Sequence, residues 1–255
     1  MTFNDQGEVL GANGDAAIRD ENVLEDVATV QRIAKAAEPL QTIHEKIVAQ
    51  AASEIVGARA ECRAGECTAM FFLISDAMFD SVKDQGVQIA IQNSGGIRAS
   101  LDAGKVIMGE VLTVLPFQNT LSTFEVSGAI LLAALKNGVN QVEEGAGRFL
   151  QVAGLRFTFN PKAEVGQWAA DAQVLKSGHF DPLDLSKLYS VVSNNYVRNG
   201  GDGCKMFKVA TNFYDYGPDL ADVVAEYMAT YPAYKPYLAG RIAERLRRWQ
   251  IPSRL

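Results

Sequence analysis

The chain has 255 residues, of which 48% are hydrophobic, and a formal net charge of −6. This is enough apolar material for one large core or two modest ones. Charged residues are mixed along the chain without a basic patch, which argues against a nucleic-acid binder. The four arginines between Arg241 and Arg248 are more simply the solvated face of a terminal helix.

The first residues do not look like a targeting signal. They lack the basic and apolar regions of a signal peptide, so the chain expressed as written is expected to be cytoplasmic. The most apolar stretch, residues 68–79, is short and contains Asp76, so we expect no membrane association.

In chain order, the first predicted elements are a short strand and turn over residues 2–10, then a long helix over residues 22–52. Pro39 is expected to kink or split this helix. A helix of this length ahead of the main domain suits an interdomain connector, although the pattern alone slightly favours an ordinary packed helix.

The rest of the chain alternates between helical and strand patterns. Further helices are predicted over residues 67–83, 109–115, 128–137 and 219–228, with Pro116 and Gly138 as stop signals. Strands are predicted over residues 87–92, 120–126, 149–159, 172–176 and 188–193. Because helices and strands are interspersed without strict βαβ alternation, the fold class is predicted as α+β, with a mixed β-sheet flanked by helices.

Two of the three cysteines, Cys62 and Cys67, lie five positions apart, and Cys204 stands alone. A disulfide could close the short loop in an oxidising compartment, and two reduced cysteines fit the spacing equally well. A zinc site is not expected, because no second ligand pair exists and the only histidines are His44 and His179.

A predicted strand runs into a glycine-rich turn, Asn-Ser-Gly-Gly-Ile-Arg, at residues 93–98. Gly95 and Gly96 allow the backbone to approach a ligand closely, and successive N–H groups in such a turn bind anions. Arg98 can contact two phosphate oxygens, and Asn93 can donate from its amide. Taken alone, however, the pattern favours a tight turn with an exposed arginine, and no P-loop lysine follows.

Aromatic residues accompany two other turns. Phe117 follows Pro116 and can present its ring to a flat ligand, although such a residue more often packs in a core. Residues 194–203 combine asparagines and glycines with Tyr196 and Asp202, whose carboxylate can accept two hydrogen bonds from vicinal hydroxyls. A ligand-binding loop and a structural loop remain equally compatible with this segment, whereas one acid is too few for calcium.

Catalytic signatures are missing from the sequence. Phosphomonoester hydrolysis usually needs one or two metal ions held by several His and Asp residues, and two isolated histidines cannot supply such a site. The sequence also has no Gly-x-Ser-x-Gly motif and no cysteine with an obvious histidine partner.

Four motifs in order carry a family resemblance over residues 62–242. They are Asn-x-Gly-Gly-Ile-Arg, Gly-Glu-Val-Leu-x-Val-Leu-Pro-Phe, Gly-Arg-Phe-Leu-Gln-Val-x-Gly-Leu-Arg-Phe and Asn-x-x-x-Asn-Gly-Gly-Asp-Gly. Together they resemble the C-terminal, substrate-specificity domain of the 5'-nucleotidase family, which includes periplasmic UDP-sugar hydrolases and animal ecto-5'-nucleotidases. Any one motif is modest support, but the order and spacing of all four are specific.

The resemblance implies where a phosphate would bind. Arg63, Asn93 and Arg98 match phosphate-binding positions of the family, and the Gly95–Gly96 turn lies between the last two.

The resemblance also implies how a nucleoside would bind. Phe117 and Tyr196 match two aromatic residues that sandwich the base, and Asp202 matches the acid that binds the ribose hydroxyls. Many members have phenylalanine at the position of Tyr196, and stacking should survive this difference. A Cys62–Cys67 disulfide is implied as well.

The implied domain organisation has two parts. Residues 1–52 would be the end of a metallophosphatase domain and a linker helix, and residues 53–255 the nucleotide-binding domain. This chain would bind nucleosides, nucleotides or nucleotide sugars for nucleotide catabolism, without a cofactor of its own. The divalent metal pair is expected on an N-terminal metallophosphatase domain absent from the chain, which is therefore expected to be inactive alone.

The parent protein would be periplasmic or extracellular. A non-enzymatic nucleotide-binding module and a protein-interaction module are the alternative functions.

Overall fold

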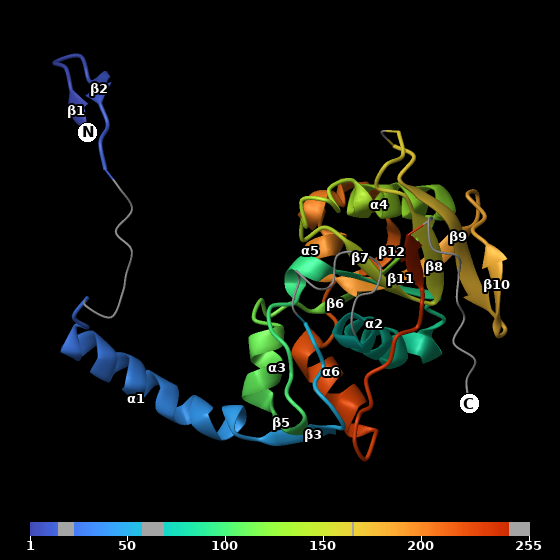
Figure 1. Cartoon of the computed structure of the whole chain (residues 1–255), viewed down its shortest axis with the longest axis horizontal. Helices are drawn as coiled ribbons and strands as arrows, with labels where there is room; N and C mark the ends of the chain where they lie inside the picture. Colours follow the sequence, from blue (N-terminus) through green and yellow to red (C-terminus); the bar gives the residue numbers. More distant parts are fainter. Residues whose placement is uncertain (15–22, 58–68, 165, 245–255) are drawn as a thin grey trace. The chain divides into compact units, whose positions relative to one another are not determined.

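The computed structural model describes residues 1–14, 23–57, 69–164 and 166–244 (Figure 1). The chain divides into two compact units, residues 1–42 and residues 43–255. Arg63, Cys62 and Cys67 lie outside the described residues.

The first unit contains a small hairpin and most of one helix. Strands β1 (Thr2–Phe3) and β2 (Val9–Gly11) pair antiparallel, and Asn4 Oδ1 in the turn accepts hydrogen bonds from the N–H groups of Gln6 and Glu8. Helix α1 (Val27–His44) has no buried residue, and Pro39 lies within it. Of the two outcomes expected at Pro39, a kink or a split, the split does not occur, and the predicted continuation of the helix to residue 52 is wrong.

A strand replaces the expected end of that helix. Strand β3 (Ile47–Ala51) pairs antiparallel with β5 (Gly104–Ile107), and Ala51 is buried. Val48 and Ala49 pack against the neighbouring core. The sequence of residues 47–51 continues the helical spacing of apolar residues. The segment nevertheless forms a strand, because it packs against the core and pairs with a strand more than fifty positions away.

A five-stranded mixed sheet organises the second unit, in the order β12-β6-β11-β4-β7. Strands β11 and β4 run parallel, and all other neighbours in the sheet are antiparallel. The strands are β4 (Ile89–Asn93), β6 (Leu121–Ser127), β7 (Leu150–Ala153), β11 (Leu188–Asn194) and β12 (Thr211–Tyr214). This mixed sheet with flanking helices confirms the α+β prediction.

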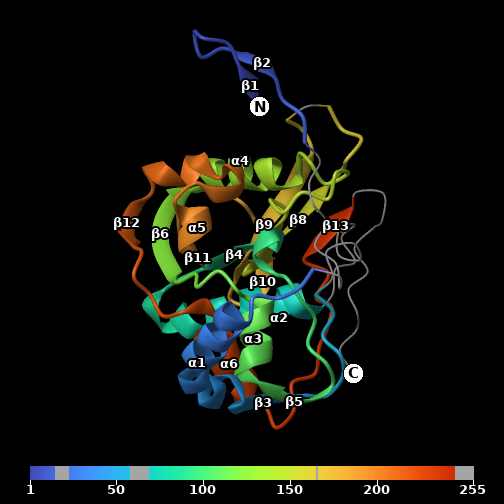
Figure 2. The same cartoon turned by 90° about the vertical axis from the view of Figure 1, so that its left-hand side faces the viewer.

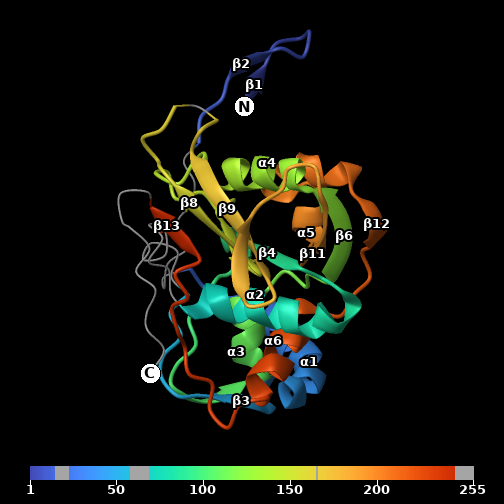
Figure 3. The same cartoon turned by 90° about the vertical axis from the view of Figure 1, so that its right-hand side faces the viewer.

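The sheet separates two hydrophobic cores, because alternate residues of a strand face opposite sides. On β4, Ala90 packs into one core, whereas Ile89 and Ile91 pack into the other. Helix α2 covers the first face and α4 the second (Figures 2 and 3). Every residue of β4 is buried, so its end is held rigidly by packing on both faces.

A second sheet has four strands in the order β10-β9-β8-β13. The strand predicted over residues 149–159 is broken at Gly154, whose φ of +70° favours glycine, into β7 and β8. The strands are β8 (Leu155–Phe159), β9 (Ala169–Lys176), β10 (His179–Pro182) and β13 (Ile242–Glu244). A terminal helix was expected over residues 241–248. Residues 242–244 instead form strand β13, which pairs with β8.

The predicted helices occur near their expected positions. They are α2 (Ala69–Val82), α3 (Met108–Val114), α4 (Gly128–Val139) and α6 (Leu220–Ala229). Gly138 does not end α4 as predicted, since it lies inside the helix with Arg148 and Leu150 directly against it. The short helices are α5 (Asn195–Arg198), η1 (Lys83–Gln85), η2 (Ser94–Gly96), η3 (Gly201–Gly203) and η4 (Lys205–Val209).

Among the described helices, none is both long enough and apolar enough to cross a lipid bilayer.

Candidate functional site

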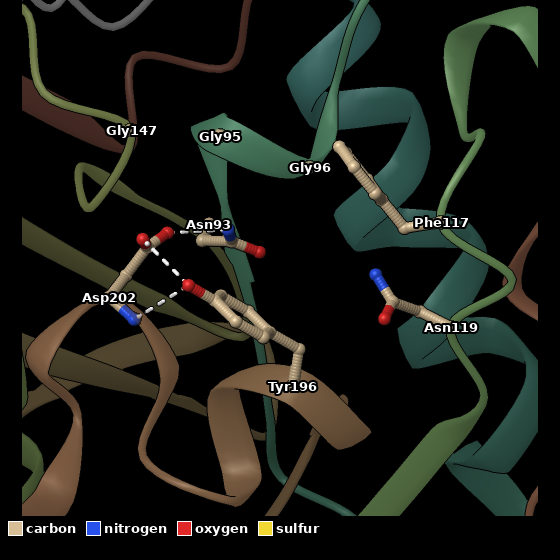
Figure 4. A pocket seen from close by; sticks show the side chains of 8 residues that line it. All are labelled: Asn93, Gly95, Gly96, Phe117, Asn119, Gly147, Tyr196 and Asp202. Atoms are coloured by element: carbon tan, nitrogen blue, oxygen red, sulfur yellow. Dashed lines mark hydrogen bonds between the residues drawn. The ribbon is translucent and has the colours of Figure 1, made fainter. Parts of the chain in front are cut away.

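A cavity of about 500 Å³ lies where several glycine-rich turns meet (Figure 4). Its walls come from the end of β4, from η2, from the connections before β6 and β7, and from α5 and η3. The lining residues are Asn93, Gly95, Gly96, Phe117, Asn119, Gly147, Tyr196 and Asp202. Six of these eight were predicted from the sequence as site residues.

The parallel pairing of β4 and β11 explains the position of the cavity. Because the two strands run in the same direction, their final residues, Asn93 and Asn194, come out at the same edge of the sheet. Asn194 Oδ1 accepts a hydrogen bond from Val197 N–H (2.8 Å) and so caps α5, which carries Tyr196. Crevices beside the carboxyl ends of parallel strands are common ligand sites.

Two backbone segments touch at the cavity wall. Gly95 N–H donates to the Gly147 carbonyl (2.7 Å), and a Cβ added to Gly147 would lie 2.8 Å from Gly95 Cα. A Cβ on Gly96 would lie 2.6 Å from Gln92 Nε2. Packing against backbone therefore favours glycine most strongly at Gly147, and the turn exposes backbone rather than side chains to the cavity.

Asp202 is held from several directions. Its Oδ2 accepts from Asn93 Nδ2 (2.6 Å), and its Oδ1 accepts from the Tyr196 hydroxyl (3.2 Å). Asn137 Nδ2 donates to its backbone carbonyl (2.9 Å). These contacts keep Asp202 at φ +50°, a left-handed conformation that non-glycine residues seldom adopt.

The buried amide side chains of Gln92 and Asn194 form hydrogen bonds with Asn93. Asn194 Nδ2 donates to both Asn93 Oδ1 and Gln92 Oε1, each at 2.9 Å, and Gln92 Nε2 donates to the Asn93 carbonyl (3.1 Å). Gln92 and Asn194 are fully buried and Asn93 is nearly so. Because buried polar groups need partners, this set fixes Asn93 in one orientation toward Asp202.

The two predicted aromatic residues are half-exposed at the cavity. Phe117 is 54% exposed and Tyr196 48%, whereas Phe124, Phe157 and Phe207 elsewhere in the domain are buried. Both rings project from different segments beside the same cavity (Figure 4). Phe117 is thus not the core residue that sequence pattern alone favoured.

Arg98 is exposed and does not line the cavity. Its guanidinium lies 5.8 Å from the centroid of the Phe117 ring, within range of a cation–π contact. Arg98 is therefore next to one aromatic wall, on the outer side of the site.

Two lining residues, Asn119 and Gly147, were not predicted. Both had a signal in the sequence, since Asn119 comes two positions after Phe117 and Gly147 begins the third family motif.

Cys204 lies under the Asp202 loop and is fully buried. Burial raises the pKa of its thiol to about 11, with the nearby Asp202 charge adding to the effect. A thiol this poorly ionised is a weak nucleophile, so we assign it no chemical role.

No group of three or more His, Cys, Asp or Glu side chains within residues 1–14, 23–57, 69–164 and 166–244 is arranged to hold a metal ion.

The sequence matches the family model of the 5'-nucleotidase C-terminal domain over residues 46–209. The 5'-nucleotidase of the ray Diplobatis ommata is 32% identical, over 95% of this chain and 44% of its own length. The human 5'-nucleotidase is 28% identical, again over 95% of this chain and 44% of its own length. The chain thus spans less than half the length of these relatives.

Solved structures of nucleotidases are also similar to this chain. The 5'-nucleotidase precursor of Thermus thermophilus is 38% identical and superposes with a TM-score of 0.79, over 95% of this chain and 48% of its own. The NAD nucleotidase of Haemophilus influenzae is 27% identical with a TM-score of 0.72, over 86% of this chain and 41% of its own.

Proposed function

Because this chain belongs to the family of 5'-nucleotidase C-terminal domains, we propose that its cavity binds the nucleoside part of a nucleoside 5'-phosphate or nucleotide sugar. The observation that carries the proposal is the pair of half-exposed rings, Phe117 and Tyr196, beside a cavity that also contains the Asp202 carboxylate. Two accessible ring faces beside one cavity can stack on a flat base, and bases are suitable ligands for such rings.

In this proposal the base stacks between Phe117 and Tyr196, and the ribose hydroxyls donate to Asp202. Stacking contributes about 1–3 kcal/mol per base. Arg98, which lies next to Phe117, would attract the phosphate, with Arg63 and Asn93 as the further predicted contacts. The backbone of Gly95 and Gly96 allows the ligand to approach the turn closely.

We further propose that this domain acts as part of a longer hydrolase in nucleotide catabolism. The family's metallophosphatase domain would supply a divalent metal pair that activates water and stabilises charge on the phosphate. The residues of this chain would hold the base and ribose, so that the phosphate is presented in one position. A periplasmic or extracellular location and a Cys62–Cys67 disulfide belong to the same proposal.

Calorimetric titration of the 255-residue chain with adenosine, AMP and UDP-glucose tests the binding proposal. We expect saturable binding of at least one of them, weakened about tenfold or more by Phe117→Ala, since one stacking ring is lost. Phe213→Ala is the matched control, because Phe213 is similarly exposed (58%) and does not line the cavity. Absence of binding to all three ligands, with the protein folded by circular dichroism, would refute the proposal.

A further inference from the structure

The Tyr196 hydroxyl makes two hydrogen bonds to a single residue, Asp202 (Figure 4). It donates to the carboxylate Oδ1 (3.2 Å) and accepts from the Asp202 backbone N–H (3.3 Å). A phenylalanine at this position would keep a ring face for stacking but would make neither bond. The hydroxyl therefore has a structural effect separate from that of the ring.

Both oxygens of Asp202 already have one protein donor each. Asn93 Nδ2 occupies one site on Oδ2, and the Tyr196 hydroxyl occupies one site on Oδ1. An ionised carboxylate has about four lone-pair sites, two on each oxygen. Counting donors among the described residues, one acceptor site thus remains on each oxygen, which matches the two donors of a vicinal diol.

The ring of Tyr196 is fixed together with the carboxylate. A Cβ added to Gly201 would lie only 2.4 Å from Tyr196 Cε1, so the ring rests directly on the Gly201 backbone. Asp202 is the next residue along the chain. The surface that stacks a base and the group that accepts from a sugar are therefore parts of one local assembly.

We propose that the Tyr196 hydroxyl is a specificity-determining group for the sugar: it positions the Asp202 carboxylate to accept both hydroxyls of a ribose. This inference rests on the proposed function and deepens it. Tyr196 acts on the base through its ring and on the sugar through Asp202. Without the hydroxyl, Oδ1 loses its fixed donor and the carboxylate gains rotational freedom that ribose binding must then remove.

The test is titration of the parent and the Tyr196→Phe variant with adenosine and with 2',3'-dideoxyadenosine, which has no sugar hydroxyls. We expect the variant to bind adenosine about five- to tenfold more weakly, the scale for losing one hydrogen bond of ordinary net strength. Affinity for the dideoxy compound should change by less than about twofold, because the stacking ring remains. Tyr216→Phe, which removes a phenol hydroxyl from an 83% exposed residue outside the cavity lining, should change neither affinity.

A double-mutant cycle adds a readout that a purely structural role would not produce. In an Asp202→Ala background, Tyr196→Phe should have no further effect on adenosine binding. Equal weakening of both nucleosides by Tyr196→Phe, or unchanged adenosine affinity, would overturn the inference. A parent that binds both nucleosides equally would also overturn it while leaving base stacking intact, whereas a parent that binds neither refutes the proposed function itself.

Discussion

Replacing Gly201 by alanine should displace the Tyr196 ring without unfolding the domain. The new Cβ would lie 2.4, 2.5 and 2.6 Å from three ring atoms, Cε1, Cζ and Cδ1. Carbon atoms in contact normally lie about 3.5–4.0 Å apart, so the ring has to move by about 1 Å or more. Because Tyr196 is 48% exposed, it can rotate away into solvent and lose its hydrogen bonds to Asp202.

The expected effects on binding and on stability therefore differ. Loss of one stacking ring, worth about 1–3 kcal/mol, predicts adenosine binding weaker by about tenfold or more. The change in unfolding free energy should stay below about 1 kcal/mol, which corresponds to a shift in Tm of at most about 4 °C for a domain of this size. Calorimetry measures the first quantity and thermal melting the second.

Gly14→Ala is the matched control, because its new Cβ meets no atom within 4 Å. If Gly201→Ala binds adenosine as tightly as the parent, the position of the ring does not matter and the reasoning is wrong. A large drop in Tm would instead show that the ring cannot move aside.

Three further predictions can be tested separately. Gly147→Ala should destabilise the fold by about 1–3 kcal/mol in chemical denaturation, because its Cβ meets the Gly95 backbone rather than a flexible side chain; a change of a few tenths would contradict this. The chain alone, with added zinc, manganese or cobalt, should release no phosphate from AMP, since the described residues hold no metal-binding cluster; turnover of about 1 per second or faster would refute it. Under non-reducing conditions Cys204 should be the one reactive thiol and should react only after denaturation, because it is buried and burial raises its pKa to about 11; three reactive thiols would exclude a Cys62–Cys67 disulfide.

Helices with local signals were predictable from the sequence. Asp219 is the first residue of the helix expected over residues 219–228, and its Oδ1 accepts from Ala221 N–H (2.8 Å) as the N-cap of α6. Strands without a clear alternating pattern were not predictable, whereas β4, β6 and β11 were predicted although their partners are distant. Strand β3 pairs with β5 far along the chain, and every residue of the edge strand β12 is exposed, so neither carries a clear alternating pattern.

The residue types of the site were predictable, but their contacts were not. The sequence placed Asn93, Tyr196 and Asp202 in turns with suitable chemistry. It could not indicate that Asn93, expected to contact phosphate, donates to Asp202 across 109 positions. Such a contact depends on β4 and β11 ending at the same edge of the sheet, which is a property of topology rather than of local composition.

The buried amides of Gln92, Asn93 and Asn194 have a consequence for how this domain can diverge. Asn194 is central to the set, because replacing it removes the donor of the fully buried Gln92 Oε1 and one donor of Asn93 Oδ1, and a buried oxygen left without a partner costs about 1–3 kcal/mol. Effects of substitutions at contacting positions do not add. A lineage that loses Asn194 must therefore also change Gln92, and an intermediate with only the first change carries this cost. We expect the three amides to be inherited as a unit, even where the rings above them vary.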